Sequence, residues 1–527
     1  MFFKDSSFVF LLPLFFLLIL TLCVFNIYGG YSDSIDRLVL SSGNDGVIYL
    51  NNHYYGGVGN RNIVISKNLT IIGNNNTVID GNLQSRIFKV NPNCHLTLLN
   101  LSLVNGSSDR GGLIYCSDNA SLDITNCKLS NSKAIYGGAG IYLSNSACLS
   151  NIINCSFIDN NVDAYYGGAI FNNNSSLNIE NSVFKDNHAH FGGAIYNKLF
   201  STKKTNIVNS TFESNNCDAN GAAIYTIGGS GSKIQGSNFT RNYINPDIGS
   251  YGDGSALCVD GTKDFNIIDT NFKENKAVKG ACIFNTNDGE VNILSSNLTK
   301  NIAGAGGAIY NDKGAVYITD ISNIKNNIAY SHYGGAIVNK GFIKMTISNI
   351  DNNSCNRYGG AIYSTTGDIV IGDCELNNNI GNGTGGAISA TDTNIEVTTT
   401  EFRNNVAGTG GAIHANNCKL NFTNSRRGDN SFVGNTATQF DGGALFLMGQ
   451  TNGFIYNTVF ESNKCSGKSG RGGAIFYGSD IKCINKTTNT TGSLVLLDLI
   501  TYSGNTANRG SNVYSSKYGD IGAIGRK

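Results

Sequence analysis

The chain has 527 residues, of which 65 are Gly, 3 are Pro and none is Trp. Charged residues make up 14%, and 38 basic against 37 acidic residues leave a net charge of +1. Because the sequence has no basic block or stripe, we expect no nucleic-acid partner. The 40% of hydrophobic residues suffice for a core, so the solubility of the protein must come from Asn, Ser, Thr and Gly.

Residues 1–30 form a separate N-terminal segment. Residues 8–28 are almost all apolar and follow Lys4. This pattern predicts an export signal that is removed near Tyr28 to Tyr31, or an uncleaved membrane anchor. We therefore expect an exported protein, secreted or at the cell surface. It would contact a membrane only through this segment, and only if the segment is retained.

Residues 31–61 are predicted to form an N-terminal cap. Ile35, Leu38 and Val39 give residues 32–40 the pattern of a short amphipathic segment, which would cover the open strand edges at the end of a stack of strands. The first strands are expected at residues 47–50, 62–65 and 68–72, where β-branched and aliphatic residues gather.

A Gly-Gly-Ala-Ile unit then recurs about every 25 to 30 residues, a period typical of solenoids, propellers and arrays. Clear copies begin at Gly167, Gly192, Gly306, Gly334, Gly359, Gly385, Gly410, Gly442 and Gly472. Degenerate copies begin at Gly111, Gly137, Gly221, Gly254, Gly280 and Gly510.

A second landmark runs in phase with the glycines: an apolar residue followed three positions later by Asn. It begins at Phe157, Phe184, Phe212, Phe239, Phe272, Leu298, Ile324, Ile350, Leu376, Phe402, Phe432, Phe460 and Tyr502. Between the two landmarks lie short alternating runs such as Leu177-x-Ile179, which predict strands. Each repeat thus contains two or three short strands and no helical pattern.

The repeat predicts an all-β fold, a single-stranded right-handed parallel β-helix of about 16 coils over residues 62–515, followed by a tail at 516–527. A propeller is disfavoured because roughly a dozen or more blades exceed what propellers close. Stacked coils would place the repeat Ile and the Phe or Leu in inward columns. The Asn side chains would bond amide to amide along the stack, and the Gly pair would permit a sharp turn or a close approach. The expected molecule is a monomeric rod on the order of 75 to 80 Å long.

Gly-Gly-Ala-Ile paired with Phe-x-x-Asn resembles the repeat of the polymorphic outer-membrane proteins of chlamydial type, which are surface adhesins with a β-helical passenger. The Asn- and Thr-rich composition, with Asn68-Leu-Thr-Ile-Ile-Gly73 and Val78-Ile-Asp-Gly81, looks more like archaeal adhesin-like exported β-helix proteins. The resemblance covers about residues 45–515. It implies a β-helix and an adhesin-like function at the cell surface, whereas a shared fold does not by itself fix a function.

Of the 14 Cys residues, Cys127, Cys155, Cys217, Cys282, Cys355, Cys374 and Cys465 occupy positions where other repeats have Ala, Ser or Thr. They are therefore interpreted as small core residues. Cys127 and Cys155 align on neighbouring repeats, and a spacing of about 4.8 Å between stacked strands lies within disulfide reach, so their disulfide state is left open.

A glycan lyase or hydrolase on this scaffold would need two or three converging carboxylates, or carboxylates with Arg or Lys. Asp159 and Asp186 occupy equivalent turn positions on adjacent coils and are interpreted as solvated turn residues, with a Ca²⁺ pair as the alternative. No acidic residue lies at a spacing that would pair it with Asp80. His188 and His190 alone supply too few ligands for a zinc site. We therefore expect no catalytic residues, no metal and no cofactor, and hence no enzyme.

Two features remain as candidates for binding. The residue after the repeat Ile is often aromatic, and strand alternation would turn it outward into a ladder that suits sugars or a protein, or that merely covers the sheet. The ladder comprises Tyr142, Phe171, Tyr196, Tyr225, Phe284, Tyr310, Tyr363, Phe446 and Phe476. The second is Arg427-Gly428-Asp429, in a stretch where the period lengthens; such a loop is an integrin ligand in some proteins, although a chance match is the simpler interpretation.

Other stretches where the period lengthens, at residues 243–255 and 482–492, are expected to be loops that leave the rod. Glycosylation sequons begin at Asn68, Asn100, Asn238, Asn297 and Asn421, and composition alone produces many of these.

Three functional hypotheses follow. The first is a non-catalytic adhesin-like rod whose partner is a glycan or protein on the surface of another cell. The second is a glycan-processing enzyme on the same scaffold, and the third is a purely structural component of the cell envelope. The sequence identifies no binding residues that choose among them.

Overall fold

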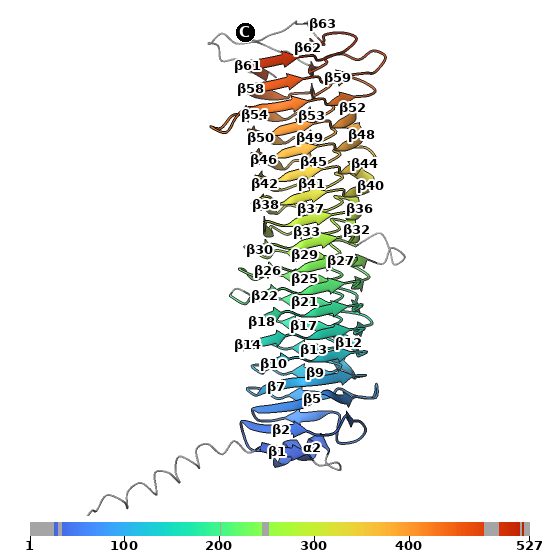
Figure 1. Cartoon of the computed structure of the whole chain (residues 1–527), viewed down its shortest axis with the longest axis vertical. Coiled ribbons are helices and arrows are strands. Elements are labelled where there is room, and N and C mark those ends of the chain that lie inside the picture. The colour runs from blue at the N-terminus through green and yellow to red at the C-terminus, as the bar shows by residue number, and fades with distance from the viewer. Residues whose placement is uncertain are drawn as a thin grey trace, which may run out of the picture.

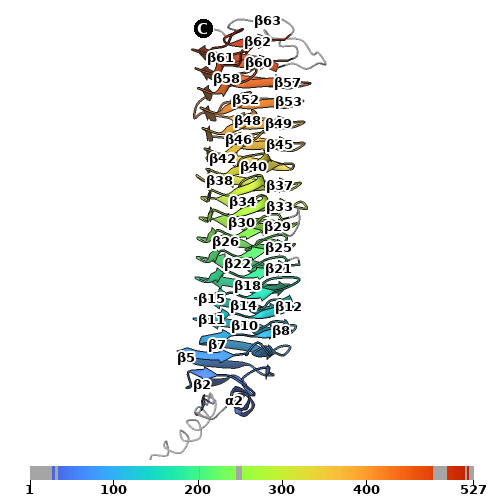
Figure 2. The same cartoon turned by 90° about the vertical axis from the view of Figure 1, so that its right-hand side faces the viewer.

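The computed structural model describes residues 26–29, 34–200, 202–244, 252–478, 495–516 and 519–520. Its parallel strands stack into a solenoid of about 16 turns, which Figure 1 shows as a rod, and the described residues include a single helix. Figure 2 shows the same stacking from the side. The predicted parallel β-helix is therefore confirmed.

Each complete coil contains four strands, which stack into four columns along the rod. The first column begins at the repeat Ile: β4 Ile63–Ile65, β6 Phe88–Val90, β9 Ile114–Cys116, β13 Ile141–Leu143, β17 Ile170–Asn173, β21 Ile195–Lys198, β25 Ile224–Ile227, β29 Leu257–Asp260, β33 Ile283–Thr286, β37 Ile309–Asp312, β41 Ile337–Asn339, β45 Ile362–Thr365, β49 Ile388–Thr391, β53 Ile413–Asn416, β57 Leu445–Met448, β60 Ile475–Tyr477 and β62 Val513–Ser515. Strand β63, Gly519–Asp520, pairs antiparallel with β62.

The second column carries the alternating runs: β1 Asn26–Gly29, β2 Gly46–Leu50, β10 Ser121–Thr125, β14 Ser146–Ile153, β18 Ser175–Glu180, β22 Thr205–Val208, β26 Lys233–Gln235, β30 Phe265–Ile268, β34 Glu290–Leu294, β38 Ala315–Thr319, β42 Phe342–Thr346, β46 Asp368–Gly372, β50 Asn394–Thr398 and β54 Lys419–Thr423. Four long strands continue from this column into the third: β5 Leu69–Asp80, β7 His95–Val104, β58 Asn452–Glu461 and β61 Val495–Ser503.

The third column carries the Phe-x-x-Asn landmark: β3 Tyr54–Tyr55, β11 Lys128–Ser130, β15 Ser156–Ile158, β19 Val183–Lys185, β23 Thr211–Glu213, β27 Asn238–Thr240, β31 Asn271–Lys273, β35 Asn297–Thr299, β39 Asn323–Lys325, β43 Asn349–Asp351, β47 Glu375–Asn377, β51 Glu401–Arg403 and β55 Asn430–Val433.

The fourth column follows that Asn: β8 Ser107–Arg110, β12 Lys133–Gly137, β16 Asn161–Val162, β20 His188–Ala189, β24 Asn216–Cys217, β28 Tyr243–Ile244, β32 Lys276–Lys279, β36 Ile302–Ala305, β40 Ile328–Tyr333, β44 Ser354–Cys355, β48 Ile380–Thr384, β52 Val406–Thr409, β56 Thr436–Ala437 and β59 Lys464–Cys465. The expectation of two or three strands per repeat was too low, because members of this column can be two residues long, too short to show an alternation.

The glycine pair closes each coil between the fourth and the first column. Gly167 has φ of 62°, and a Cβ on it would lie 2.2 Å from the carbonyl oxygen of Ile170. A Cβ on Gly168 would lie 2.2 Å from the carbonyl oxygen of Gly193 in the next coil. The first glycine is therefore required by the turn and the second by the close approach of two coils, which together confirm both predicted roles.

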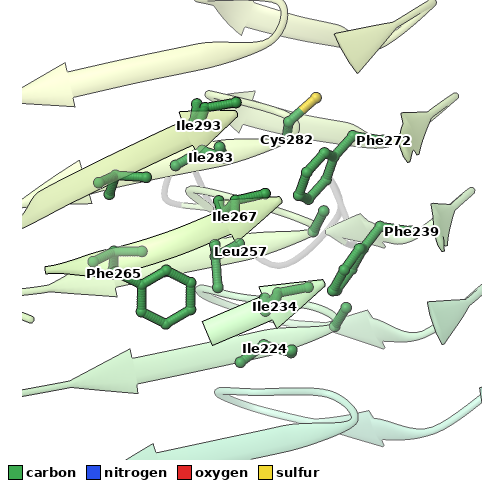
Figure 3. Packing of buried hydrophobic residues seen from close by; sticks show 14 of the residues in the cluster. Ile224, Ile234, Phe239, Leu257, Phe265, Ile267, Phe272, Cys282, Ile283 and Ile293 are labelled. Atoms are coloured by element: carbon green, nitrogen blue, oxygen red, sulfur yellow. The ribbon is translucent and has the colours of Figure 1, made fainter. Parts of the chain in front are cut away.

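The interior consists of columns of like side chains. Phe157, Phe184, Phe212, Phe239 and Phe272 stack with ring centroids 4.7 to 4.9 Å apart. Figure 3 shows Phe239 and Phe272 in this interior with the aliphatic residues Ile224, Leu257 and Ile283 of the first column. Both predicted inward columns are thus confirmed.

A buried asparagine ladder runs beside the Phe column. Each amide donates a hydrogen bond to the Oδ1 of the next at 2.9 to 3.1 Å. Its members are Asn160, Asn187, Asn215, Asn242, Asn275, Asn301, Asn327, Asn353, Asn379, Asn405, Asn435, Asn463 and Asn505. In Asn301 the Nδ2 also donates to the carbonyl of Phe272 at 3.1 Å, so both amide hydrogens have acceptors.

Residues 31–61, the predicted cap, contain the helix α2, Ile35–Ser41. Its buried residues Ile35, Leu38 and Val39 are the apolar residues of the predicted amphipathic segment, whose helical form was not predicted. The expected first strands correspond to β2, β4 and β5, of which β5 extends further than predicted, to Asp80. Strand β1 pairs in parallel with β2 and belongs to the end of the predicted N-terminal segment.

Several sequence predictions lie outside the described residues. These are residues 8–25 of the N-terminal segment, the predicted loop at 482–492, most of the lengthened stretch at 243–255 and most of the tail at 516–527. Among the residues that the structure does describe, no helix has the length and apolarity needed to cross a bilayer.

The buried ladder predicts a large difference between two asparagines of the same coil. Asn301→Ala removes both donors and leaves the Asn275 amide, the Asn327 oxygen and the Phe272 carbonyl without their buried partner, which should cost about 2 to 4 kcal/mol. Denaturant unfolding followed by circular dichroism should show a markedly lower midpoint.

Asn297→Ala is the matched control, because Asn297 belongs to a half-exposed asparagine ladder on the same coil and bonds Asn271 and Asn323 at 2.9 and 3.0 Å. It should cost less than about 1 kcal/mol, since water replaces the lost partners. Equal midpoints for the two variants would contradict this account of the ladder.

Candidate functional site

The predicted aromatic ladder lies on the outer side of the first column, in a cluster separate from the core. Its rings stack on one another: centroids are 4.7 Å apart for Tyr142 and Phe171, 5.1 Å for Tyr196 and Tyr225, and 4.9 Å for Phe446 and Phe476. The outward direction predicted from strand alternation is therefore confirmed.

The ring faces of the ladder are nevertheless not offered to a ligand. Tyr363 is half-buried, and the other eight members are only 4 to 9% exposed. Neighbouring rings cover each other's faces, and Tyr166 and Phe191, which precede glycine pairs, pack against the outside. Of the two interpretations left open by the sequence, the burial of the rings favours the one in which they cover the sheet, because the same register that aligns the rings also buries them.

Cations cover further parts of the ladder. The Lys340 Nζ lies 5.2 Å from the Tyr310 ring centroid, and the Arg471 guanidinium lies 4.6 Å from that of Phe476. Replacing Tyr196, Tyr225 and Tyr310 with Ser would therefore remove packing as well as any binding surface.

The turn residues Asp159 and Asp186 are exposed and adopt positive φ of 54° and 53°, as expected for solvated turn positions. Partial desolvation at the surface, with Asp159 and Glu213 nearby, raises the pKa of Asp186 despite the opposing charge of Lys185. In the part of the chain that the structure describes, no cluster of three or more His, Cys, Asp or Glu residues is arranged to hold a metal ion.

The remaining polar candidates have structural partners. Asp80 accepts hydrogen bonds from Tyr54 and Asn105 at 3.0 and 3.1 Å. His188 and His190 flank Asp218, whose Oδ2 lies 3.8 Å from Nε2 of the first and 3.7 Å from Nδ1 of the second. Sequence spacing missed Asp218 because it is supplied by the next coil.

The Arg427-Gly428-Asp429 loop lies outside the strands and is exposed. Arg427 Nη1 lies 3.4 Å from Asp373 Oδ2, and Asp429 accepts a hydrogen bond from Asn457. Both charged residues therefore have partners within the protein, and recognition of this loop by a receptor remains a prediction.

Cys127 and Cys155 are buried free thiols. Cys127 lies between β10 and β11, and Cys155 lies at the equivalent place between β14 and β15 of the next coil, because β10 pairs with β14 and β11 pairs with β15. A hydrogen bond from the Cys127 thiol lowers the pKa of Cys155 and correspondingly raises that of Cys127. The alignment inferred from the repeat is confirmed.

A depression on the outer face of the second column, here called the lateral groove, was not predicted. Its volume is about 540 Å³, and it crosses β42, β46, β50, β54 and β58. Its lining consists of Phe342, Asp368, Ile369, Val370, Asn394, Glu396, Lys419, Leu420, Asn421, Gly453 and Phe454.

The two ends of the lateral groove are aromatic. Phe342 lies 5.7 Å from Tyr317 between ring centroids, and Phe454 lies 5.6 Å from Tyr456. Four coil steps of about 4.8 Å each separate the two ends, so the groove is about 19 Å long. Gly453 has φ of 136°, and a Cβ there would lie 1.9 Å from the Leu420 carbonyl oxygen, so β58 lies against β54 at one end of the groove.

The floor between these aromatic ends is polar. Asp368, Asn394 and Lys419 are in register on successive coils, and Glu396 and Asn421 form a second row two residues further along. Asn394 Nδ2 donates to Asp368 Oδ1 at 2.8 Å. Carboxylates, amides and an ammonium group together accept from and donate to hydroxyl groups, so the floor suits a hydroxyl-rich ligand.

Sequence reasoning missed the lateral groove because its side chains do not repeat. The register positions Phe342, Asp368, Asn394 and Lys419 differ in type from coil to coil. A periodic search discards such positions. A list of outward positions in coil order would have found them.

An acid-sensitive residue occupies the ladder position of one coil. His414 stacks on Phe446 with centroids 5.0 Å apart, and burial lowers the pKa of His414 from 6.5 to about 4. Because the unfolded chain then takes up a proton at higher pH than the folded chain, stability is lost as the pH falls from about 6.5 to 4.

One pKa unit corresponds to about 1.36 kcal/mol, so this shift should lower the free energy of unfolding by about 3 kcal/mol at acid pH. His414→Phe, which extends the stack toward Phe446, should remove that part of the acid dependence. Denaturant midpoints measured between pH 7 and 4 test this, and parallel pH profiles for the two proteins would contradict it.

Comparisons with known proteins support the repeat assignment. A family model of the Chlamydia polymorphic membrane protein repeat matches residues 181–198 and 348–365. Both stretches contain the third-column strand, the ladder asparagine and the Gly-Gly-Ala-Ile unit. No curated protein sequence matches the chain significantly.

Solved structures show a weak likeness. The catalytic unit of a GH87 α-1,3-glucanase from Streptomyces thermodiastaticus strain HF3-3 has 11% identity and a TM-score of 0.19, with 90% of this chain and 65% of that chain covered. A mutant tailspike protein of E. coli bacteriophage HK620 in complex with a hexasaccharide has 11% identity and a TM-score of 0.20, with 93% and 77% covered. At such low scores the likeness carries no argument about function. The chain is therefore a parallel β-helix repeat protein, and two of its coils match the polymorphic membrane protein repeat.

Proposed function

We propose that this protein is a non-catalytic, adhesin-like rod on the outside of the cell that binds extended glycans in the lateral groove. The observation that carries the proposal is the groove itself, with aromatic ends and a polar floor over five coils. The matches to the polymorphic membrane protein repeat support an outer-surface location.

The geometry suits an extended chain of sugars. Phe342 and Phe454 contact opposite ends of the bound chain through the apolar faces of sugar rings, while Asp368, Asn394 and Asn421 bond its hydroxyl groups. Because the strands do not need to move to form these contacts, little conformational entropy is lost on binding. The rest of the rod serves as a stiff spacer, and several rods on one cell add their weak contacts by avidity.

A specific observation keeps a glycan hydrolase as the second candidate. Asp368 and Glu396 both line the lateral groove and belong to adjacent coils. Hydrolases of this kind use two carboxylates that flank the bond to be cleaved. Incubation with each bound glycan and assay of new reducing ends distinguishes the two functions: cleavage that Glu396→Gln abolishes would replace the adhesin proposal.

The groove predicts which phenylalanines matter for binding. Neutral oligosaccharides of four or more units are screened on a glycan array, and the tightest binder is titrated by calorimetry. Phe342→Ala and Phe454→Ala should each weaken binding about tenfold, because each removes a ring contact worth about 1.4 kcal/mol.

Phe200→Ala is the control, since Phe200 is 53% exposed and lies outside the groove. Its affinity should equal that of the unaltered protein. Absence of binding to every neutral oligosaccharide, or equal affinities for all three variants, would contradict the proposal. Immunolabelling of intact cells tests the surface location separately.

A further inference from the structure

A second depression, here called the basic pocket, lies on a different face of the rod, over β28, β32, β36 and β40 of the fourth column. Its volume is about 870 Å³. It is bounded by the side chains of Arg241, Tyr243, Lys276, Lys300 and Tyr330 and has Ile302 at its base. None of these residues lines the lateral groove.

Two tyrosines form opposite walls of the basic pocket. Tyr243, Lys276, Ile302 and Ile328 are in register on successive coils, and Tyr330 follows Ile328 by two residues. The walls are therefore separated by three coil steps, or about 14 Å along the rod. The hydroxyl of Tyr243 accepts a hydrogen bond from Asn216 Nδ2 at 2.8 Å, which holds this wall in place.

These tyrosines differ from those of the aromatic ladder. Tyr243 is 39% exposed and Tyr330 is 55% exposed, whereas the ladder tyrosine Tyr196 is 8% exposed. Neither wall ring stacks on another aromatic ring among the residues that the structure describes. Their faces are thus accessible to the apolar face of a ligand.

The base of the basic pocket is apolar. Ile302 and Val278 are half-buried, and Ala277 and Ile244 belong to a small buried cluster that also contains Cys217. An apolar base between two accessible aromatic rings favours a ligand with C–H groups on at least one face.

The charge of the basic pocket is positive. Arg241 pairs with Glu213, and Glu274 Oε1 lies 3.5 Å from Lys273 Nζ. Lys276 and Lys300 are exposed, and neither forms an ion pair with any residue in the described ranges. Two ammonium groups beside an apolar base therefore remain available for an anion.

We propose that the basic pocket binds a carboxylate-bearing sugar, such as a uronic acid unit of an acidic polysaccharide. Lys276 and Lys300 pair with the carboxylate, while Tyr330 or Tyr243 contacts the ring face and Ile302 covers its C–H groups. A sugar fits better than an acidic peptide, because the pocket combines free ring faces with cations and its backbone groups are already paired within the sheet. This site is independent of the lateral groove and of the function proposed for it.

The test titrates the full-length protein with an oligogalacturonate of three or four units, with its carboxyl-reduced neutral counterpart and with tetraglutamate as an acidic peptide. The oligogalacturonate should bind at least tenfold more tightly than the other two, and its affinity should fall as the salt concentration rises. The double variant Lys276→Gln, Lys300→Gln should lose at least tenfold in affinity, and Tyr330→Ala should lose a similar factor.

Two control variants test whether the affinity depends on this pocket in particular. Lys128→Gln with Lys133→Gln removes two exposed lysines elsewhere on the rod and should leave the affinity unchanged. Phe342→Ala should also leave it unchanged, although it weakens neutral glycans in the lateral groove. Absence of oligogalacturonate binding, equal binding of the neutral counterpart, tighter binding of tetraglutamate, or equal loss in the lysine control would each overturn the proposal.

Discussion

The register between successive coils is the constraint on which the rest of the molecule depends. The buried asparagine ladder enforces this register most strictly. Within the ladder, both hydrogens and the oxygen of an amide form hydrogen bonds with fixed partners in neighbouring coils. For Asn301 these partners are Asn275, Asn327 and the carbonyl of Phe272. A coil displaced by one residue would bury amides that have no hydrogen-bond partner and would turn apolar side chains toward solvent. Both changes would lower the free energy of unfolding.

The same register explains why the repeat is visible at some positions and absent from others. Gly167 recurs because the turn within each coil requires positive φ, Gly168 because backbone of the adjacent coil fills the space beside it, and Ile170 because it packs in the core. Outer positions whose side chains do not stack into a ladder meet mainly solvent, so they are free to vary. The two depressions occupy such variable positions, where Phe342 aligns with Asp368 and Tyr243 with Lys276.

The exposure of aromatic residues on the outside depends on the residues in register with them on adjacent coils. Where rings recur on successive coils, as at Tyr196 and Tyr225, each covers the next and the stack becomes a second, external core. Where a tyrosine is followed by lysine and isoleucine, as at Tyr243, its face stays open. Regular repetition thus favours stability, and its interruption leaves aromatic side chains exposed.

The sequence by itself determined the parallel β-helix, the columns of Ile, Phe and Asn, the role of the glycine pair and the amphipathic segment with Ile35 and Leu38, although not that this segment is a helix. All of these follow from local periodicity, because stacking places equivalent residues in equivalent environments. It could not determine how exposed the ladder tyrosines are, which residues from adjacent coils meet at Asp218, or where Phe342 and Phe454 enclose a groove. Those features were decided by the tertiary structure, because they depend on distances between side chains that are about 25 to 110 residues apart in the chain and follow no period.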